Sequence, residues 1–130
     1  MRVLVIGAGR MGAIRVEDLA SDERVDEVLV TNRTAARAEE LAERFGARAV
    51  PWSMATDDPA DAVVVAVGTD AHEGLLAALL PHGRPVLCEK PIALTLADTG
   101  RVIEIAAEHG VPLQIGFQRR FDTAIRAVHD

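Results

Sequence analysis

Cysteine and long apolar runs are scarce in this 130-residue sequence, and each scarcity excludes a class of protein. The single cysteine, Cys88, excludes an internal disulfide framework, and its place inside an apolar run indicates a buried side chain rather than a reactive thiol. No apolar run reaches the ~18 residues that a membrane-spanning helix needs. The apolar N-terminus is too short for a signal peptide and enters a glycine turn, so we expect a cytoplasmic protein.

Basic charge is lacking as well, since the formal net charge is −6 with 14 Lys and Arg against 20 Asp and Glu. Nucleic acids and anionic membrane surfaces favour basic partners, so we expect neither as a partner of this acidic chain. A metal site is not expected either. All the basic residues except Lys90 are arginines, which makes this lone lysine a candidate for a specific role.

Apolar segments rich in β-forming residues alternate with segments of helical periodicity along the whole chain. The length and the hydrophobic content of 49% suit one domain with a single core. Regular alternation of strand and helix predicts the α/β class, as a Rossmann-type doubly wound parallel sheet in three αβα layers. We predict strands at 2–7, 25–31, 47–50, 62–67, 85–89 and 113–117, and helices at 11–21, 35–45, 70–81 and 96–109.

Residues typical of the two ends of helices support these boundaries. The predicted N-caps are Thr34, Thr69 and Thr95, and a glycine follows three of the helices at Gly46, Gly83 and Gly110. One irregular stretch remains, from Pro51 to Pro59. It holds the only tryptophan, Trp52, which we interpret as an anchor for this loop in preference to a ligand-facing ring.

A glycine-rich turn, Gly7-Ala8-Gly9-Arg10-Met11-Gly12, joins the first predicted strand to the first predicted helix. In this context the three glycines have separate roles. Gly7 makes the tight turn, Gly9 lets the backbone approach a pyrophosphate, and Gly12 lets the helix pack closely. The backbone N–H groups of the helix N-terminus then bind the phosphate charge. The sequence therefore predicts a dinucleotide-binding turn.

The end of the second strand, where the cofactor type is usually read, contains Asn32, Arg33 and Thr34, followed by Arg37. A carboxylate here binds the ribose of NAD, whereas an arginine accommodates the 2′-phosphate of NADP. The pattern also resembles the NADP-binding turn of shikimate dehydrogenases. We therefore favour NADP over NAD; the alternative is an ordinary capped helix with solvated arginines.

Two further segments follow strands and should lie at the same edge of the sheet. Gly68 and Thr69 follow the fourth strand, with His72 in the next helix, and Glu89-Lys90-Pro91 follow the fifth. Lys90 could bond a substrate hydroxyl and help to move its proton, although a surface ion pair is an equal alternative. His72 is typical of a local cap or packing group rather than a catalyst.

Four motifs together resemble the glucose–fructose oxidoreductase/inositol dehydrogenase/rhizopine catabolism (Gfo/Idh/MocA) family. They are Gly7-x-Gly9-x-x-Gly12, Thr69-Asp70-Ala71-His72, Glu89-Lys90-Pro91 and Gly116-Phe117-Gln118-Arg119-Arg120-Phe121-Asp122. Two positions depart from the usual family pattern. Asp70 stands where the family often has proline, and Asn32 stands where NAD-using members often have aspartate, which leaves the cofactor open.

The resemblance implies hydride transfer between NAD(P) and a hydroxyl carbon of a sugar, polyol or related compound. It implies that Lys90 contacts the reacting hydroxyl, that Glu89 lies beside the nicotinamide, and that the Lys90–Pro91 bond is cis. We expect Lys90 as the catalytic residue and a cofactor site formed by Gly7, Gly9, Arg10, Met11, Gly12, Asn32, Arg33, Thr34, Arg37, Val67, Gly68, Thr69, His72, Glu89 and Gln118.

The family also implies a second, substrate-binding domain, which we expect to be absent from this chain. We divide the sequence into a dinucleotide-binding domain at 1–118 and the truncated start of a linker helix at 119–130. Such a fragment should bind dinucleotide with little or no turnover, and its exposed apolar surface could form a homodimer. The alternatives are a non-catalytic dinucleotide-binding or redox-sensing module and an enzyme that reduces a different carbonyl, such as biliverdin or a nucleotide-linked keto sugar.

Overall fold

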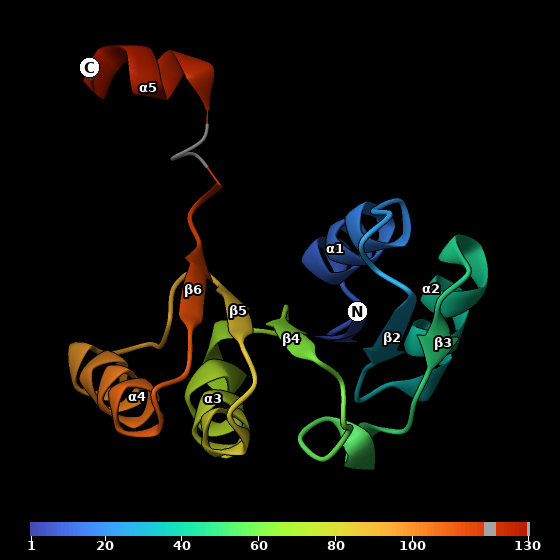
Figure 1. Cartoon of the computed structure of the whole chain (residues 1–130), viewed down its shortest axis with the longest axis horizontal. Coiled ribbons are helices and arrows are strands. Elements are labelled where there is room, and N and C mark those ends of the chain that lie inside the picture. The colour runs from blue at the N-terminus through green and yellow to red at the C-terminus, as the bar shows by residue number, and fades with distance from the viewer. Residues whose placement is uncertain (119–121, 130) are drawn as a thin grey trace.

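The computed structural model describes residues 1–118 and 122–129, and in these ranges six strands form one sheet. The strands are β1 (Arg2–Ile6), β2 (Glu27–Thr31), β3 (Arg48–Ala49), β4 (Ala62–Val65), β5 (Val86–Glu89) and β6 (Leu113–Gly116). Every pair of neighbouring strands is parallel, and the order across the sheet is β3-β2-β1-β4-β5-β6 (Figure 1). This order is that of the Rossmann fold, so the predicted fold class is confirmed.

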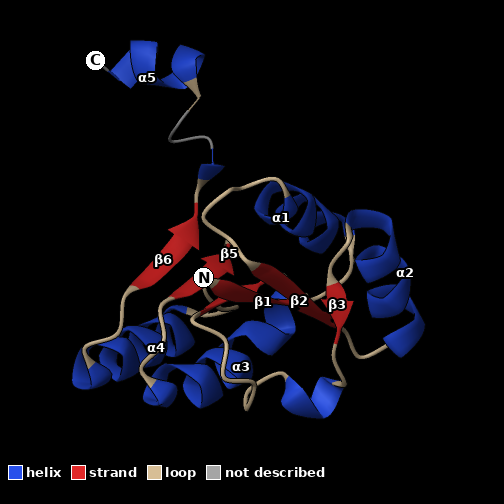
Figure 2. Cartoon of the chain, turned by 45° about the vertical axis from the view of Figure 1, so that its right-hand side comes forward, coloured by secondary structure: helices blue, strands red, loops and turns tan. Residues whose placement is uncertain are grey.

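Helices cover both faces of the sheet, with α1 and α2 on one face and α3 and α4 on the other (Figure 2). The α-helices are α1 (Arg10–Ala20), α2 (Ala35–Phe45), α3 (His72–Leu79), α4 (Leu96–His109) and α5 (Thr123–His129). Alternation along β1 divides the core: Val3 and Val5 pack toward α1 and α2, whereas Leu4 and Ile6 pack toward α3 and α4. The all-apolar pattern of the central strands follows from burial on both faces.

The chain departs from the predicted elements at two places. The helix predicted at 70–81 is divided into a 3₁₀ turn η2 (Thr69–Ala71), α3, and a second 3₁₀ turn η3 (Leu80–His82). The α-helix ends here because Pro81 has no N–H to donate to the preceding turn. The stretch predicted to be irregular contains a further 3₁₀ turn, η1 (Trp52–Met54).

The predicted helix caps are confirmed at most positions. Thr95 accepts a hydrogen bond from the Asp98 N–H at 3.1 Å, and the three predicted glycines all end helices with positive φ. Thr34 is the N-cap of α2 but makes no side-chain cap bond. The prediction for Thr69 was wrong, because the N-cap of α3 is Ala71 and Thr69 lies inside the preceding 3₁₀ turn, whose N-cap is Gly68.

The C-terminal helix α5 stands away from the sheet in both views (Figures 1 and 2). Asp122 immediately precedes α5, and its Oδ1 accepts hydrogen bonds from the N–H groups of Ala124 and Ile125 in the first turn. Arg119, Arg120 and Phe121 of the fourth sequence motif lie outside the described residues. In the described parts of the chain, no helix is both long enough and apolar enough to cross a membrane.

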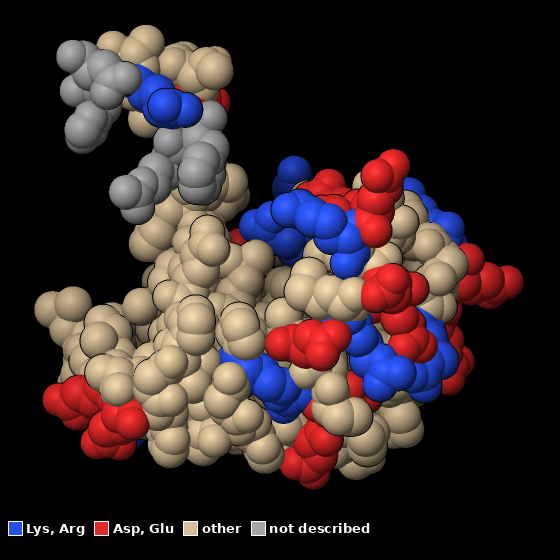
Figure 3. Space-filling model, in the orientation of Figure 1, with Lys and Arg blue, Asp and Glu red and all other residues tan. Residues whose placement is uncertain are grey.

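Charged and apolar side chains are unevenly distributed over the surface. Figure 3 shows charged side chains gathered over the half that contains α1, α2 and β3, with fewer over β6, α3 and α4. Large apolar side chains are exposed at Leu94, Leu96, Ile103 and Phe117. The expected apolar surface is therefore present, while the homodimer stays a prediction.

The thiol of Cys88 is fully buried in β5, as the sequence predicted. Burial and the neighbouring Glu89 carboxylate raise the pKa of Cys88 to about 12, because both disfavour the thiolate. Since the thiolate is the reactive form, the folded chain should not react with iodoacetamide at about pH 8. Mass spectrometry should find one label per chain after unfolding in guanidinium chloride; labelling of the folded chain at a similar rate would contradict this burial.

Candidate dinucleotide-binding site

The candidate site lies at the carboxyl edge of the sheet, between β1 and β4. The strand order reverses direction here, because the chain first builds outward through β2 and β3 and then returns to place β4 on the other side of β1. Loops that leave β1 and β4 therefore diverge, and the space between them is the usual ligand position in open parallel sheets. The loop after β1 is the glycine turn.

Each glycine of the turn has the environment that its predicted role requires. Gly7 has a φ of 113°, and a Cβ there would overlap the carbonyl oxygen of Ala66 in the loop after β4. A Cβ on Gly12 would overlap the carbonyl oxygen of Gly7, so α1 packs directly on the turn. Gly9 is different, since no atom lies within 4 Å of a Cβ built there. Gly9 is the N-cap of α1 and faces open space, which leaves room for a phosphate group.

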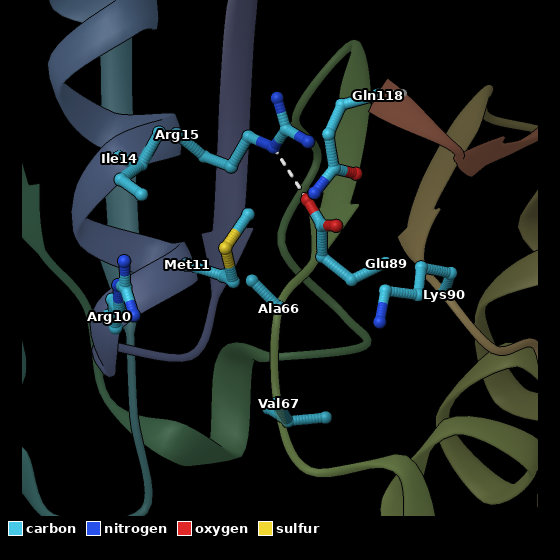
Figure 4. Close-up of a pocket in the computed structure, with 9 residues that line it drawn as sticks. All are labelled: Arg10, Met11, Ile14, Arg15, Ala66, Val67, Glu89, Lys90 and Gln118. Carbon is cyan, nitrogen blue, oxygen red and sulfur yellow. Dashed lines mark hydrogen bonds and ion pairs between the residues drawn. The ribbon is translucent and has the colours of Figure 1, made fainter. Parts of the chain in front are cut away.

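Three cavities border this turn. One, of about 310 Å³, lies between α1 and α2, and the other two lie toward β5 and toward β2. The larger, which we call the β5-side cavity, has a volume of about 710 Å³ (Figure 4). It is lined by Arg10, Met11, Ile14, Arg15, Ala66, Val67, Glu89, Lys90 and Gln118. The smaller, the β2-side cavity, has a volume of about 260 Å³. Its lining is Gly7, Ala8, Gly9, Asn32, Arg33, Arg37, Trp52, Ala66, Val67, Gly68, Asp70 and Ala71.

A close ion pair crosses the β5-side cavity between α1 and β5. Arg15 Nε donates to Glu89 Oε1 at 2.6 Å, and only 21% and 8% of the two side chains are exposed. A Cβ on Gly116 would lie 2.7 Å from Glu89 Oε2, so the missing side chain on β6 leaves room for the carboxylate. Figure 4 shows Glu89 turned toward Arg15 and Gln118.

Lys90 follows β5 and lines the same cavity. Its peptide bond to Pro91 is cis, as the family resemblance implied. The side chain is exposed, and within residues 1–118 and 122–129 it has no ion-pair partner. The carboxylate next to it in sequence, Glu89, pairs with Arg15 instead. The described residues therefore show no surface ion pair of Lys90, and its role stays a prediction.

The β2-side cavity combines arginines with an aromatic ring. The Arg33 guanidinium lies over the Trp52 ring, 5.4 Å from its centroid, in a cation–π contact. Trp52 also packs against the core, so it both anchors its loop and lines the cavity. Arg37 reaches this cavity from the first turn of α2.

The side-chain amide of Asn32 makes two hydrogen bonds within the protein. Its Oδ1 accepts a hydrogen bond from the Ala8 N–H, and its Nδ2 donates to the Thr34 carbonyl, both at 3.1 Å. Asn32 therefore fastens the glycine turn to the end of β2, and one N–H of its Nδ2 is used within the protein while the residue still lines the β2-side cavity.

The remaining predicted residues lie behind the cavities rather than on their walls. Gly12, Thr34, Thr69 and His72 line neither of them. His72 is buried, with Nδ1 2.7 Å from the Pro91 carbonyl oxygen and Nε2 3.1 Å from the Val67 carbonyl oxygen. The ring therefore links the loop after β4 to the loop after β5, in agreement with its interpretation as a packing group.

Several residues that line the two cavities were not predicted from the sequence, and among them are Arg15 and Trp52. Arg15 lies four residues after Met11, so helical spacing places the two side chains on one face of α1, and this signal was available. Trp52 offered no such signal, because it belongs to a short 3₁₀ turn without periodicity. Among the described residues, no group of three or more His, Cys, Asp or Glu side chains could hold a metal ion.

The chain is similar to known dehydrogenases in sequence and in structure. It is 42% identical to inositol 2-dehydrogenase 1 of Mycolicibacterium vanbaalenii over 97% of this chain and 38% of that protein, so it spans well under half of that relative. A scyllo-inositol dehydrogenase of Lactobacillus casei, solved with NAD(H) and scyllo-inositol, superimposes with a TM-score of 0.88 at 25% identity, over 98% of this chain and 39% of the other.

Biliverdin reductase of Synechocystis, solved with biliverdin and NADP⁺, superimposes with a TM-score of 0.87 at 27% identity, over 98% of this chain and 41% of the other. Proteins of this fold that bind either cofactor are therefore similar to this chain. The model of the Gfo/Idh/MocA family, described as an oxidoreductase family with an NAD-binding Rossmann fold, matches residues 1–117. The chain belongs to this family.

Proposed function

We propose that this chain binds a nicotinamide dinucleotide across the switch point between β1 and β4. The observation that carries the proposal is the pair of cavities on either side of the glycine turn. The pyrophosphate would lie at Gly9 and the N-terminus of α1, where the backbone is open. The adenosine half would enter the β2-side cavity, because the end of β2 is where the ribose of the adenosine is recognised. The nicotinamide half would then occupy the β5-side cavity.

The cavities supply the contacts to the cofactor, and residues behind them hold the walls in place. The contact residues in this proposal are Gly7, Gly9, Arg10, Met11, Arg33, Arg37, Val67, Gly68, Glu89 and Gln118. Asn32 would line the β2-side cavity and fasten the glycine turn, while Gly12, Thr34, Thr69 and His72 would shape the site from outside these contacts. Residues 1–118 would form the dinucleotide-binding domain, with 119–130 leading toward a substrate-binding domain.

The reaction that fits this site is reversible oxidation of a hydroxyl carbon of a polyol. Inositol is the polyol named for the similar dehydrogenases, so it is the first substrate to test. The bound cofactor would accept or return the hydride. Lys90 would bond the reacting hydroxyl and carry its proton, since its exposed amine lines the β5-side cavity without an ion-pair partner in the described residues. A binding or sensing module has no need of such a group, which favours the enzyme.

The proposal includes a preference for NADP over NAD. Arg33 and Arg37 both line the β2-side cavity, and the stacking of Arg33 on Trp52 holds its guanidinium in place before a ligand arrives. Asp70, in the 3₁₀ turn after β4, is the one carboxylate among the residues that line this cavity, so the two arginines outnumber it. The 2′-phosphate would be bound by the two arginines, because their positive charges attract it.

Fluorescence titration with NADPH and NADH tests both the binding and the preference. We expect the chain to bind NADPH more tightly, and the substitution Arg33→Asp to reverse this order by weakening NADPH about 10- to 100-fold, since it replaces an attraction by a repulsion. The control is Arg24→Asp, which makes the same change of charge at an exposed arginine that pairs with Asp22 before β2, at the opposite edge of the sheet. Tighter binding of NADH by the unmodified chain would refute the NADP preference, and an unchanged order in the variant would remove Arg33 from the site.

A further inference from the structure

The ion pair between Arg15 and Glu89 lies in the cavity where the proposed function places the nicotinamide. We propose that Arg15 is a positioning residue that offsets the charge of Glu89 and so sets the relative affinity of the site for the oxidised and reduced cofactor. This inference rests on the proposed function and adds to it a residue that controls the redox balance of the bound dinucleotide.

The Glu89 carboxylate is held in one place by contacts from two directions. Arg15 reaches across from α1 and bonds Oε1 at 2.6 Å (Figure 4). On the side of β6, Gly116 leaves space for Oε2 that any larger residue would fill. Only a small fraction of Glu89 is exposed, so its charge is screened less by water than a surface charge would be.

The charges of the cavity act differently on the two forms of the cofactor. The nicotinamide ring is cationic when oxidised and neutral when reduced, so a nearby carboxylate favours the oxidised form and a nearby cation favours the reduced form. The charged side chains that line the β5-side cavity are Arg10, Arg15, Glu89 and Lys90. Arg15 is the cation in direct contact with Glu89, so removing it leaves the carboxylate without its partner and shifts the balance toward the oxidised form.

The test measures the dissociation constants of NADP⁺ and NADPH on the 130-residue chain, by calorimetry and by fluorescence. The quantity compared is the dissociation constant of NADP⁺ divided by that of NADPH. We expect Arg15→Met to lower this ratio about three- to tenfold and Glu89→Gln to raise it by a similar factor. The double variant should return close to the unmodified value. A tenfold change corresponds to about 30 mV in the two-electron potential of the bound cofactor.

Two control variants separate the charge of Arg15 from its packing. Arg15→Lys keeps the charge, so the ratio should stay within about twofold of the unmodified value. Arg48→Met removes an arginine that pairs with Glu27 at 2.8 Å, at the amino edge of the sheet, and should leave the ratio unchanged. Thermal melting of every variant reports whether the domain is folded.

The outcomes distinguish this inference from the proposed function. If Arg15→Met binds both forms with the ratio of the unmodified chain, the inference is overturned while the proposed function stands. If Arg15→Met does not fold, Glu89→Gln decides, because it leaves no uncompensated carboxylate in the cavity; an unchanged ratio there overturns the inference equally. If the unmodified chain binds neither form, the proposed function falls and the inference falls with it.

Discussion

Replacing Gly12 by alanine should weaken NADPH binding about 100-fold and lower the free energy of unfolding by about 1–3 kcal/mol. The new Cβ would overlap the carbonyl oxygen of Gly7, and that atom belongs to the backbone and cannot turn aside as a side chain can. Helix α1 must therefore move away from the turn, which displaces the N–H groups that are proposed to bind the pyrophosphate. Fluorescence titration and thermal melting measure the two effects on the same sample.

Two other glycines serve as matched controls for this substitution. In Gly9→Ala no protein atom lies within 4 Å of the new methyl group, so the melting temperature should be unchanged. NADPH binding should be lost, because the methyl group fills the space proposed for the pyrophosphate. Gly100→Ala, inside α4, also meets no neighbour and should stabilise the helix by about 0.5–1 kcal/mol without affecting binding. Normal binding by the Gly12 variant, or by the Gly9 variant, would show that the pyrophosphate does not lie at this turn.

Removal of the Lys90 amine should abolish most of the turnover once the chain is joined to the remaining part of a family member. In such a fusion we expect Lys90→Ala to lower kcat about 10²- to 10⁴-fold, the usual contribution of a group that transfers a proton. The dissociation constant of the cofactor should change much less, because Lys90 is proposed to contact the substrate. Steady-state rates with myo-inositol and the preferred cofactor give the measurement.

Lys90→Arg separates the positive charge from the transfer of a proton. A guanidinium stays protonated at any accessible pH, so this variant should be nearly as slow as Lys90→Ala. Arg24→Ala, at the opposite edge of the sheet, is the control for loss of an exposed cation. Full activity of the alanine variant would remove Lys90 from the reaction, and full activity of the arginine variant would leave it an electrostatic role only.

The sheet and the glycine turn could be predicted from the sequence because both depend on local patterns. The all-apolar strand at 62–67 allows little but burial on both faces, and β4 has this burial from Val63 to Val65. The spacing of Gly7, Gly9 and Gly12 reflects contacts that a Cβ would block, and the structure shows two of those contacts directly.

The contacts inside the site could not be predicted in the same way, because they depend on how elements far apart in the sequence meet. Arg15 and Glu89 are separated by 74 residues in the sequence. Their side chains meet because Gly12 lets α1 pack close to the sheet. Asn32 looked like a free amide at the end of a strand, but it lies beside the Ala8 N–H, which competes for its oxygen. The position of Trp52 depends on a 3₁₀ turn that follows a two-residue strand, where propensities carry little information.

His72 has a consequence for how this site could diverge among related proteins. One imidazole ring lies between the carbonyls of Val67 and Pro91, so an insertion in either loop would disturb the packing of this buried ring. The loop after β2, which carries Arg33, is not tied to this ring. Cofactor choice can therefore evolve at the end of β2 by single substitutions, while the segment that holds Lys90 changes little in length.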